Sequence, residues 1–597
     1  MAKLKVHSVK YNFLMNFILT ASGFIFPLIT FPYVSVVLGA TSNGIVSFVA
    51  SYSAYFLMVA QLGVPTYGVR ACARVRDDKE KLSKTAHEIF IINIIMSVLV
   101  LGAYILSIFL IPSLAENRVL LLIYSVTIVM NAFGMEWLYR AVEQYDYITV
   151  RSLIFKLISI GLMFAFVHQS SDYIIYALTL VLSQVGSYVL NFIRIRKFIT
   201  LKPFKHYNLK RHIKPLLLLF SQSIAISIYT NLDTIMLGFM STYEQVGFYN
   251  ASIRLQSIIA SFVASLGTVL LPRMSYYVKN KESDKFLSLM GKALNYATFI
   301  SMPLAVFVSV MAGDIITFIA GQGYYGAVGS IIFLSLSVVA LGLTNIIGLQ
   351  VLTPLNKDKY VLISVIIGAV IDFVLNFFWI PIYGATGAAL STLICEFSVL
   401  AVQIFFARKL LAHVKKTIYL YKYIILGIAA AVPVYFIQYW GIPFSIVRLI
   451  IGGVIYAAVY LGVLAVIKDP LVNEVFRFVK GKLKKKKAEE VGNETDENNI
   501  SEALTAASSE DSISSDVSVR SDVNDNTADD IILDSFFDSD VDGDDVKSFE
   551  NAKKRTDIFD DDLFGDKNSS DKSSDNNSDN KPGDKSDNNP NGNKDKL

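Results

Sequence analysis

Long apolar runs separated by short basic segments fill the first 470 residues of the chain. Residues 11–69 contain no Asp, Glu, Lys, Arg or His at all. A membrane-crossing helix needs about 20 mostly apolar residues, because only a helix satisfies its own backbone hydrogen bonds within the hydrocarbon layer. The stretch therefore predicts two membrane spans joined by a short turn near Gly39–Gly44.

The same pattern continues and predicts an all-α integral membrane protein of about fourteen transmembrane helices. Single charges inside an apolar run are allowed in this count, and the fifth helix is the shortest. The expected helices are 11–38, 43–63, 87–111, 118–139, 152–168, 173–193, 214–240, 247–272, 293–312, 327–352, 360–381, 386–407, 421–438 and 446–467.

The distribution of basic residues predicts the orientation of these helices, since Lys and Arg concentrate in cytoplasmic loops. With a cytoplasmic N-terminus, 40 of the 43 Lys and Arg of residues 1–487 fall on the inside. Arg118 and Arg448 fall outside, and Arg254 lies within a span. Both termini are therefore expected in the cytoplasm, and no cleavable secretory signal is expected.

Composition divides the chain into a basic body and an acidic tail. Of all residues 53% are hydrophobic and 17% are charged, whereas soluble proteins carry about 25% charged residues. The net charge is +24 over residues 1–487 and −20 over residues 488–597. This composition excludes a soluble enzyme with one water-facing surface, and no nucleic-acid partner is expected.

The tail of residues 488–597 is expected to be a disordered cytoplasmic extension, because it has too little apolar content to form a core. Two apolar clusters, 531–537 and 557–564, are either docking motifs for a partner such as a polysaccharide assembly protein or stray hydrophobic residues. The basic cluster of Lys482 and Lys484–Lys487 is expected to contact anionic lipid headgroups and to attract the tail.

An internal repeat predicts two lobes. Val37-Leu-Gly39 and Gly44 correspond to Met236-Leu-Gly238 and Gly247. An apolar residue followed by proline ends the second helix of each copy, at Pro65 and at Pro272. Six helices per copy keep both copies in one orientation, which is typical of transporters with a central cavity. The expected parts are an N-terminus (1–10), an N-lobe (11–205), a C-lobe (206–410), two extra helices with a basic segment (411–487), and the tail (488–597).

Ionisable residues within spans are costly and are therefore candidate functional residues. Arg254 and Asp233 lie on neighbouring helices, so they form either a structural ion pair or a phosphate site in which Asp233 positions Arg254. Asp372 and Glu396 lie near the middle of the membrane and either carry a coupling proton or cation or form a structural pair.

Charged residues near the inner helix ends have two interpretations as well. Glu136, Arg140 and Glu143 are either a cytoplasmic gate or ordinary interfacial charges. Arg70 and Arg74 either attract an anionic headgroup or only enforce the topology. Neither a metal site nor a cofactor is expected: the six His lack metal-ligand spacing, no Walker A motif exists, and the GxGxxG pattern at 321–326 lies between two spans.

Several short motifs resemble one bacterial transporter family. They are Pro27-Leu-Ile-Thr-Phe-Pro-Tyr33, Gly68-Val-Arg70, Glu136-Trp-Leu138, Asp233-Thr-Ile-Met-Leu-Gly238, Ile380-Pro381 and Gly387-Ala-Ala389. With these motifs, residues 10–465 resemble Wzx-type polysaccharide or O-antigen flippases of the multidrug/oligosaccharidyl-lipid/polysaccharide exporter superfamily. The resemblance implies transfer of an undecaprenyl-pyrophosphate-linked oligosaccharide to the outer leaflet of the cell membrane, without a catalytic residue.

Two other functions remain open at this point. An antiporter for drugs or cations, in the same superfamily, would use the buried acids. A membrane glycosyltransferase or polymerase is disfavoured, because such enzymes place catalytic groups in large outer loops and every outer segment here is about fourteen residues or fewer. The chain is therefore expected to be a transporter and not an enzyme.

Overall fold

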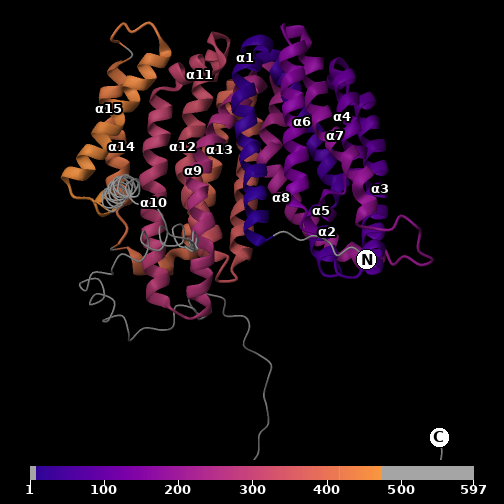
Figure 1. Cartoon of the computed structure of the whole chain (residues 1–597). Coiled ribbons are helices and arrows are strands. Elements are labelled where there is room, and N and C mark those ends of the chain that lie inside the picture. Colours follow the sequence, from indigo (N-terminus) through magenta and orange to yellow (C-terminus); the bar gives the residue numbers. More distant parts are fainter. Residues whose placement is uncertain (1–7, 416, 438, 474–597) are drawn as a thin grey trace, which may run out of the picture.

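The computed structural model describes residues 8–415, 417–437 and 439–473, and all regular elements in these ranges are helices (Figure 1). The tail and the Lys484–Lys487 cluster lie outside the described residues. The α-helices are α1 (Val9–Gln61), α2 (Val64–Ala73), α3 (Lys79–Leu110), α4 (Arg118–Gly134), α5 (Glu136–Ala141), α6 (Tyr145–Phe166), α7 (Tyr173–Arg194), α8 (Lys210–Met240), α9 (Tyr243–Lys279), α10 (Ser283–Val310), α11 (Ala312–Ala320), α12 (Val328–Thr344), α13 (Asp358–Val414), α14 (Leu420–Ile437) and α15 (Ser445–Val466).

Shorter helical segments complete the list. Four are 3₁₀ helices, η1 (Pro112–Asn117), η2 (Ser170–Asp172), η3 (Ile195–Lys197) and η4 (Gln322–Ala327), and η5 (Asn345–Leu352) is a π-helix that continues α12.

Two helices are too long for a single crossing. A straight helix of 53 residues, the length of α1, would measure about 80 Å, whereas the hydrocarbon core is about 30 Å thick. α1 breaks at Gly39, with φ 72° and ψ 176°, and the 57-residue α13 breaks at Gly384, with φ 54°. Both values of φ favour glycine. Each of these helices is therefore long enough for two crossings.

The predicted all-α membrane fold is confirmed. Within the described residues ten helices are long and apolar enough to cross a membrane, or eleven if the bent α9 is included. This count takes the broken α1 and α13 as one helix each. The exact number of fourteen spans stays a prediction.

The helices group into two halves that follow the sequence (Figure 1). We call α1–α7 the N-lobe and α8–α13 the C-lobe, and α14 and α15 pack against the C-lobe helices α10 and α11. The exact boundaries given by the sequence stay predictions. The inner end of the bundle holds the start of α1 together with α2 and α5, and the outer end is the opposite one, where η4 follows α11 (Figure 1). The break at Gly39 lies beside η4, since the Tyr324 hydroxyl of η4 donates to the Gly39 carbonyl at 3.3 Å.

Two ion pairs fix the extra helices to each other and to the C-lobe. Lys422 at the start of α14 pairs with Asp469 beyond α15. Arg448 of α15 pairs with Asp314 of α11, with an Nε to Oδ1 distance of 2.8 Å. Arg448, which the sequence placed outside, therefore has a structural partner.

Candidate functional site

The two lobes meet most closely at the outer end, where α1 crosses α9. A Cβ atom on Gly44 would lie 1.7 Å from the carbonyl oxygen of Tyr243, and one on Gly247 would lie 2.1 Å from that of Ala40. Only glycine permits this approach of two backbones. Gly44 and Gly247, equivalent in the sequence repeat, thus face each other across the boundary between the lobes.

Hydrogen bonds reinforce the outer contact. The Asn43 amide donates to the Tyr324 hydroxyl at 3.0 Å, and the Asn117 amide donates to the Tyr243 hydroxyl at 2.8 Å. Each bond joins an N-lobe residue to a C-lobe residue. The structure is therefore closed at its outer end.

Arg254 of α9 lies just inside this contact, at the boundary between the lobes. Its guanidinium lies 4.7 Å from the centre of the Phe31 ring on α1, and it lies close enough to Tyr176 of α7 to interact with that side chain electrostatically. The side chain is half-buried. No acidic side chain in the described part of the chain forms an ion pair with it.

The expected contact between Arg254 and Asp233 is absent from this conformation. Asp233 instead accepts hydrogen bonds from Asn376 at 2.7 Å and Thr392 at 3.0 Å, both on α13, and from Tyr249. The physical reason is the rotation of each helix about its own axis. α8 directs Asp233 toward α13, whereas α9 directs Arg254 toward α1. Asp233 therefore cannot position Arg254 directly in this structure.

Asp233 belongs to a buried acidic cluster in the C-lobe, together with Asp372 and Glu396. The three residues are 7%, 5% and 3% exposed. Asp233 and Glu396 are both close enough to Asp372 to interact with it electrostatically. The Asn376 amide bridges the two aspartates, at 2.7 Å from Asp233 and 3.1 Å from Asp372.

This cluster is suited to holding a positive charge inside the membrane. Neighbouring carboxylates repel each other strongly, and a bound proton or cation would relieve this repulsion. Among the described residues no group of three or more His, Cys, Asp or Glu has the geometry of a metal site. The sequence singled out Asp372 and Glu396, and the structure adds Asp233 to them.

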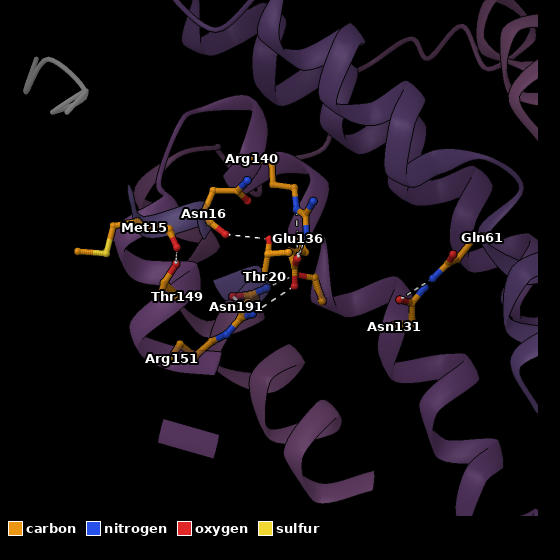
Figure 2. A network of polar contacts seen from close by, with 11 residues as sticks. Met15, Asn16, Thr20, Gln61, Asn131, Glu136, Arg140, Thr149, Arg151 and Asn191 are labelled. Atoms are coloured by element: carbon orange, nitrogen blue, oxygen red, sulfur yellow. Dashed lines mark hydrogen bonds and ion pairs between the residues drawn. The ribbon is translucent and has the colours of Figure 1, made fainter. Parts of the chain in front are cut away.

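A polar network occupies the inner end of the N-lobe (Figure 2). Arg140 donates to Glu136 at 2.7 Å, and Arg151 donates to the other carboxylate oxygen of Glu136 at 3.2 Å. Arg151 also contacts Asn191, whose amide donates to the Gly134 carbonyl at 2.7 Å. The network ties α5, α6 and α7 together. Glu143 lies apart from it and pairs with Arg76 instead.

Arg70 and Arg74 are both exposed, in α2 and just after it. They lie at the inner end of the N-lobe, and no ion pair involves either of them in the described ranges. This position fits an attraction for anionic headgroups and a topological role equally well. Their role stays a prediction.

A second buried cluster joins the lobes at the inner end. The fully buried Glu88 of α3 binds Arg211 at 2.5 Å and His212 at 2.8 Å, both at the start of α8. The Tyr67 hydroxyl is 2.8 Å from the other His212 nitrogen. Burial lowers the pKa of His212, although Glu88 opposes the shift. None of these residues stood out in the sequence, because contacts between distant helices leave no local pattern.

Lys156 lies in the middle of α6 and within the expected helix 152–168, although the orientation count includes it among the basic residues on the inside. It donates to Ser22 at 2.8 Å and lies 5.5 Å from the Phe26 ring. Lys156 therefore contributes a second positive charge beside the first half of α1.

Comparison with known proteins agrees with this architecture. Residues 9–278 match the family model described as "Polysaccharide biosynthesis protein". The chain is 24% identical over 404 residues to the "Putative O-antigen transporter" of Escherichia coli (strain K12), which covers 67% of this chain and 97% of the relative.

Solved structures share the fold. The inward closed conformation of lipid II flippase MurJ superposes with a TM-score of 0.61 at 18% identity, over 76% of this chain and 99% of that one. An inward-facing multidrug resistance MATE family transporter of the MOP superfamily superposes with a TM-score of 0.50 at 13% identity, over 66% of this chain and 96% of that one. At these identities the likeness concerns the fold alone.

Proposed function

Because the chain belongs to the polysaccharide-transporting family of the multidrug/oligosaccharidyl-lipid/polysaccharide exporter superfamily, we propose that it is a flippase for a lipid-linked oligosaccharide. It moves an undecaprenyl-pyrophosphate-linked oligosaccharide from the cytoplasmic to the outer leaflet of the cell membrane. Transfer proceeds by alternating access, in which the contact between the lobes at the outer end opens while the inner end closes.

Arg254 is the observation that supports this proposal most directly. A cationic side chain inside a membrane protein is costly unless it has an anionic partner. The protein supplies none among the described residues, whereas the pyrophosphate of the substrate would. A guanidinium binds phosphate through two parallel hydrogen bonds, and Phe31 and Tyr176 hold this one at the boundary between the lobes.

We assign the coupling ion to the acidic cluster of Asp233, Asp372 and Glu396. A proton or monovalent cation that enters the cluster removes the repulsion between its carboxylates. Since Asp233 lies on α8 and its partners lie on α13, occupancy of the cluster would change how these helices pack. Ion binding would thereby bias the orientation of the C-lobe.

The proposed orientation places both termini in the cytoplasm, in accordance with the basic residues at the inner end. Arg70 and Arg74 would attract the substrate headgroup from the cytoplasmic side, and the Glu136–Arg140 pair would serve as part of the gate. The acidic tail would meet polysaccharide assembly proteins in the cytoplasm.

The acidic cluster also favours a second candidate, a drug or cation antiporter. An antiporter of this kind would depend on Asp233 and Asp372 but not on Arg254, since its organic cation substrate would be repelled by an arginine.

Transfer of a lipid-linked oligosaccharide in proteoliposomes distinguishes the two candidates. We expect Arg254→Leu to abolish transfer and Arg254→Lys to retain a fraction, because lysine keeps the charge but loses the planar fork. Transfer by Arg254→Leu at the wild-type rate would refute the proposal. Efflux of an organic cation by that variant would favour the antiporter.

A further inference from the structure

A cavity of about 230 Å³ lies inside the N-lobe, beside the Glu136–Arg140 pair. Its lining is unusual for a membrane protein interior, since it contains three amide side chains. These are Gln61 at the end of α1, Asn93 on α3 and Asn131 on α4, and Trp137 and Tyr188 add two aromatic rings. Figure 2 shows Gln61 and Asn131 facing each other, joined by a hydrogen bond of 3.2 Å.

Two polar atoms of residues that line this cavity have no hydrogen-bond partner in the described part of the chain. They are the amide oxygen Oδ1 of Asn93, an acceptor, and the indole Nε1 of Trp137, a donor. Asn93 is 2% exposed and Trp137 is 5% exposed. A buried unpaired group costs about 1–3 kcal/mol. Both atoms are buried beside the cavity, so its lining residues leave one donor and one acceptor unsatisfied.

The cavity lies where two helices of the N-lobe are interrupted. The crossing formed by the second half of α1 and α2 breaks at Leu62 and Gly63, with φ 45° and 75°. The crossing formed by α4 and α5 breaks at Met135, with φ 41°. Transporters with repeated lobes build substrate sites where helices are interrupted, because the break exposes polar groups inside the membrane.

The C-lobe has interruptions at the equivalent positions of the repeat. α9, the counterpart of the first broken crossing, bends by 40° between Ser265 and Leu270. α12, the counterpart of α4, passes into the π-helix η5. An amide pair is found there too, since Gln350 donates to Asn345 at 3.3 Å. Recurrence in both lobes indicates that these breaks are built features of the fold.

We propose that the amide-lined cavity is a sugar subsite, which binds one uncharged sugar ring of the transported oligosaccharide at the inner end of the N-lobe. This inference rests on the proposed flippase function and names the part of the substrate that the N-lobe recognises. Every sugar hydroxyl donates and accepts a hydrogen bond, and every amide does the same. The amide side chains of Asn93, Asn131 and Gln61 therefore match a ring of hydroxyls, and Trp137 adds an aromatic ring for the apolar face of the sugar.

The size of the cavity agrees with one ring. Its volume is many times larger than the roughly 10–15 Å³ that one water molecule needs. It is smaller than the roughly 300–1,000 Å³ of pockets that bind drug-sized ligands. Arg254 lies beside Phe31 and Tyr176, and none of these three residues lines the cavity, so the sugar subsite and the proposed pyrophosphate site are separate. The sugar subsite would receive the sugar first, while the structure is closed at its outer end.

Trp137 provides a direct test. The chain has three Trp, so Trp379→Phe with Trp440→Phe leaves Trp137 as the sole indole reporter. The probes are free glucose, galactose, rhamnose and N-acetylglucosamine, added to the purified full chain in lipid nanodiscs, with potassium chloride of equal osmolarity as the control. We expect at least one sugar to give a saturating change in Trp137 emission, and Asn93→Leu to weaken that sugar at least tenfold.

The matched control is Asn250→Leu, which removes a C-lobe amide that bonds its own helix backbone at 2.9 Å. It should leave the sugar response unchanged. If Asn93→Leu fails to fold, Asn131→Cys replaces it, and the same sugar should slow maleimide labelling of that cysteine. A response no larger than that to potassium chloride, or one that Asn93→Leu leaves intact, would overturn the sugar subsite and indicate a cavity filled by water.

The outcomes separate this inference from the proposed function. If Arg254→Leu loses transfer of the lipid-linked oligosaccharide but no sugar changes the Trp137 emission, the flippase proposal stands and the sugar subsite is rejected. A sugar response in a protein that transfers no lipid-linked oligosaccharide would reject the flippase and, with it, the assignment of the bound sugar to a transported substrate.

Discussion

Replacement of Gly44 by alanine should open the outer end of the protein. The added Cβ would lie 1.7 Å from the Tyr243 carbonyl oxygen, where ordinary contact begins at 3.4 Å. The lobes must therefore separate locally by about 1.7 Å. Backbone atoms on both sides form the contact, so no side-chain rotation can relieve it.

The energetic effect follows from the same contact. Overpacking of a tight contact costs about 1–3 kcal/mol. If only the state closed at the outer end bears this cost, the equilibrium shifts by about 5–150-fold toward the state open at the outer end. Gly102→Ala is the matched control, because a Cβ there meets nothing within 4 Å.

Spin-label distances measure the shift. Labels at Ser113 and Gln322, both exposed at the outer end of different lobes, would report the separation, since the native Cys72 and Cys395 are buried. We expect a longer distance to gain population in Gly44→Ala and not in Gly102→Ala. Identical distance distributions in the two variants would show that the glycine contact does not hold the lobes together.

Three further predictions concern stability, topology and the tail. Glu88→Gln should lower the free energy of unfolding of the purified protein by about 1–3 kcal/mol. The substitution removes the buried carboxylate that binds the half-exposed Arg211 and His212. An unchanged melting temperature would contradict this prediction. An impermeant maleimide added to intact cells should label Thr242→Cys and miss Lys281→Cys, whereas labelling of the second site would overturn the helix count. Deletion of residues 488–597 should leave the body inserted at normal levels, and its loss from the membrane would reveal a structural role of the tail.

The broad architecture could be predicted from the sequence because the membrane imposes a strong pattern. Apolar runs of about 20 residues and basic loops reflect the bilayer directly. The turn expected near Gly39–Gly44 exists as a break at Gly39 within α1. The repeat that paired Gly44 with Gly247 also marked the outer contact, although the sequence did not reveal that the two glycines touch.

The arrangement of buried polar residues could not be predicted in the same way. Helix order places Asp233 and Arg254 on neighbouring helices, but the rotation of each helix decides that Asp233 bonds Asn376 while Arg254 lies against Phe31. Arg151 was counted among ordinary cytoplasmic charges, yet it is 3% exposed and contacts Asn191, forty positions away. Such contacts depend on packing, and packing leaves no periodic signal in one sequence.

The most direct test of the account is the transfer of a fluorescent undecaprenyl-pyrophosphate-linked oligosaccharide across proteoliposomes that contain the purified protein. We predict transfer by the wild-type protein and none by Arg254→Leu at equal protein content, because the pyrophosphate then lacks its cationic partner within the membrane. Equal transfer by the two proteins, or none by the wild-type protein above empty liposomes, would contradict the assignment of this chain as a flippase that binds its substrate through Arg254.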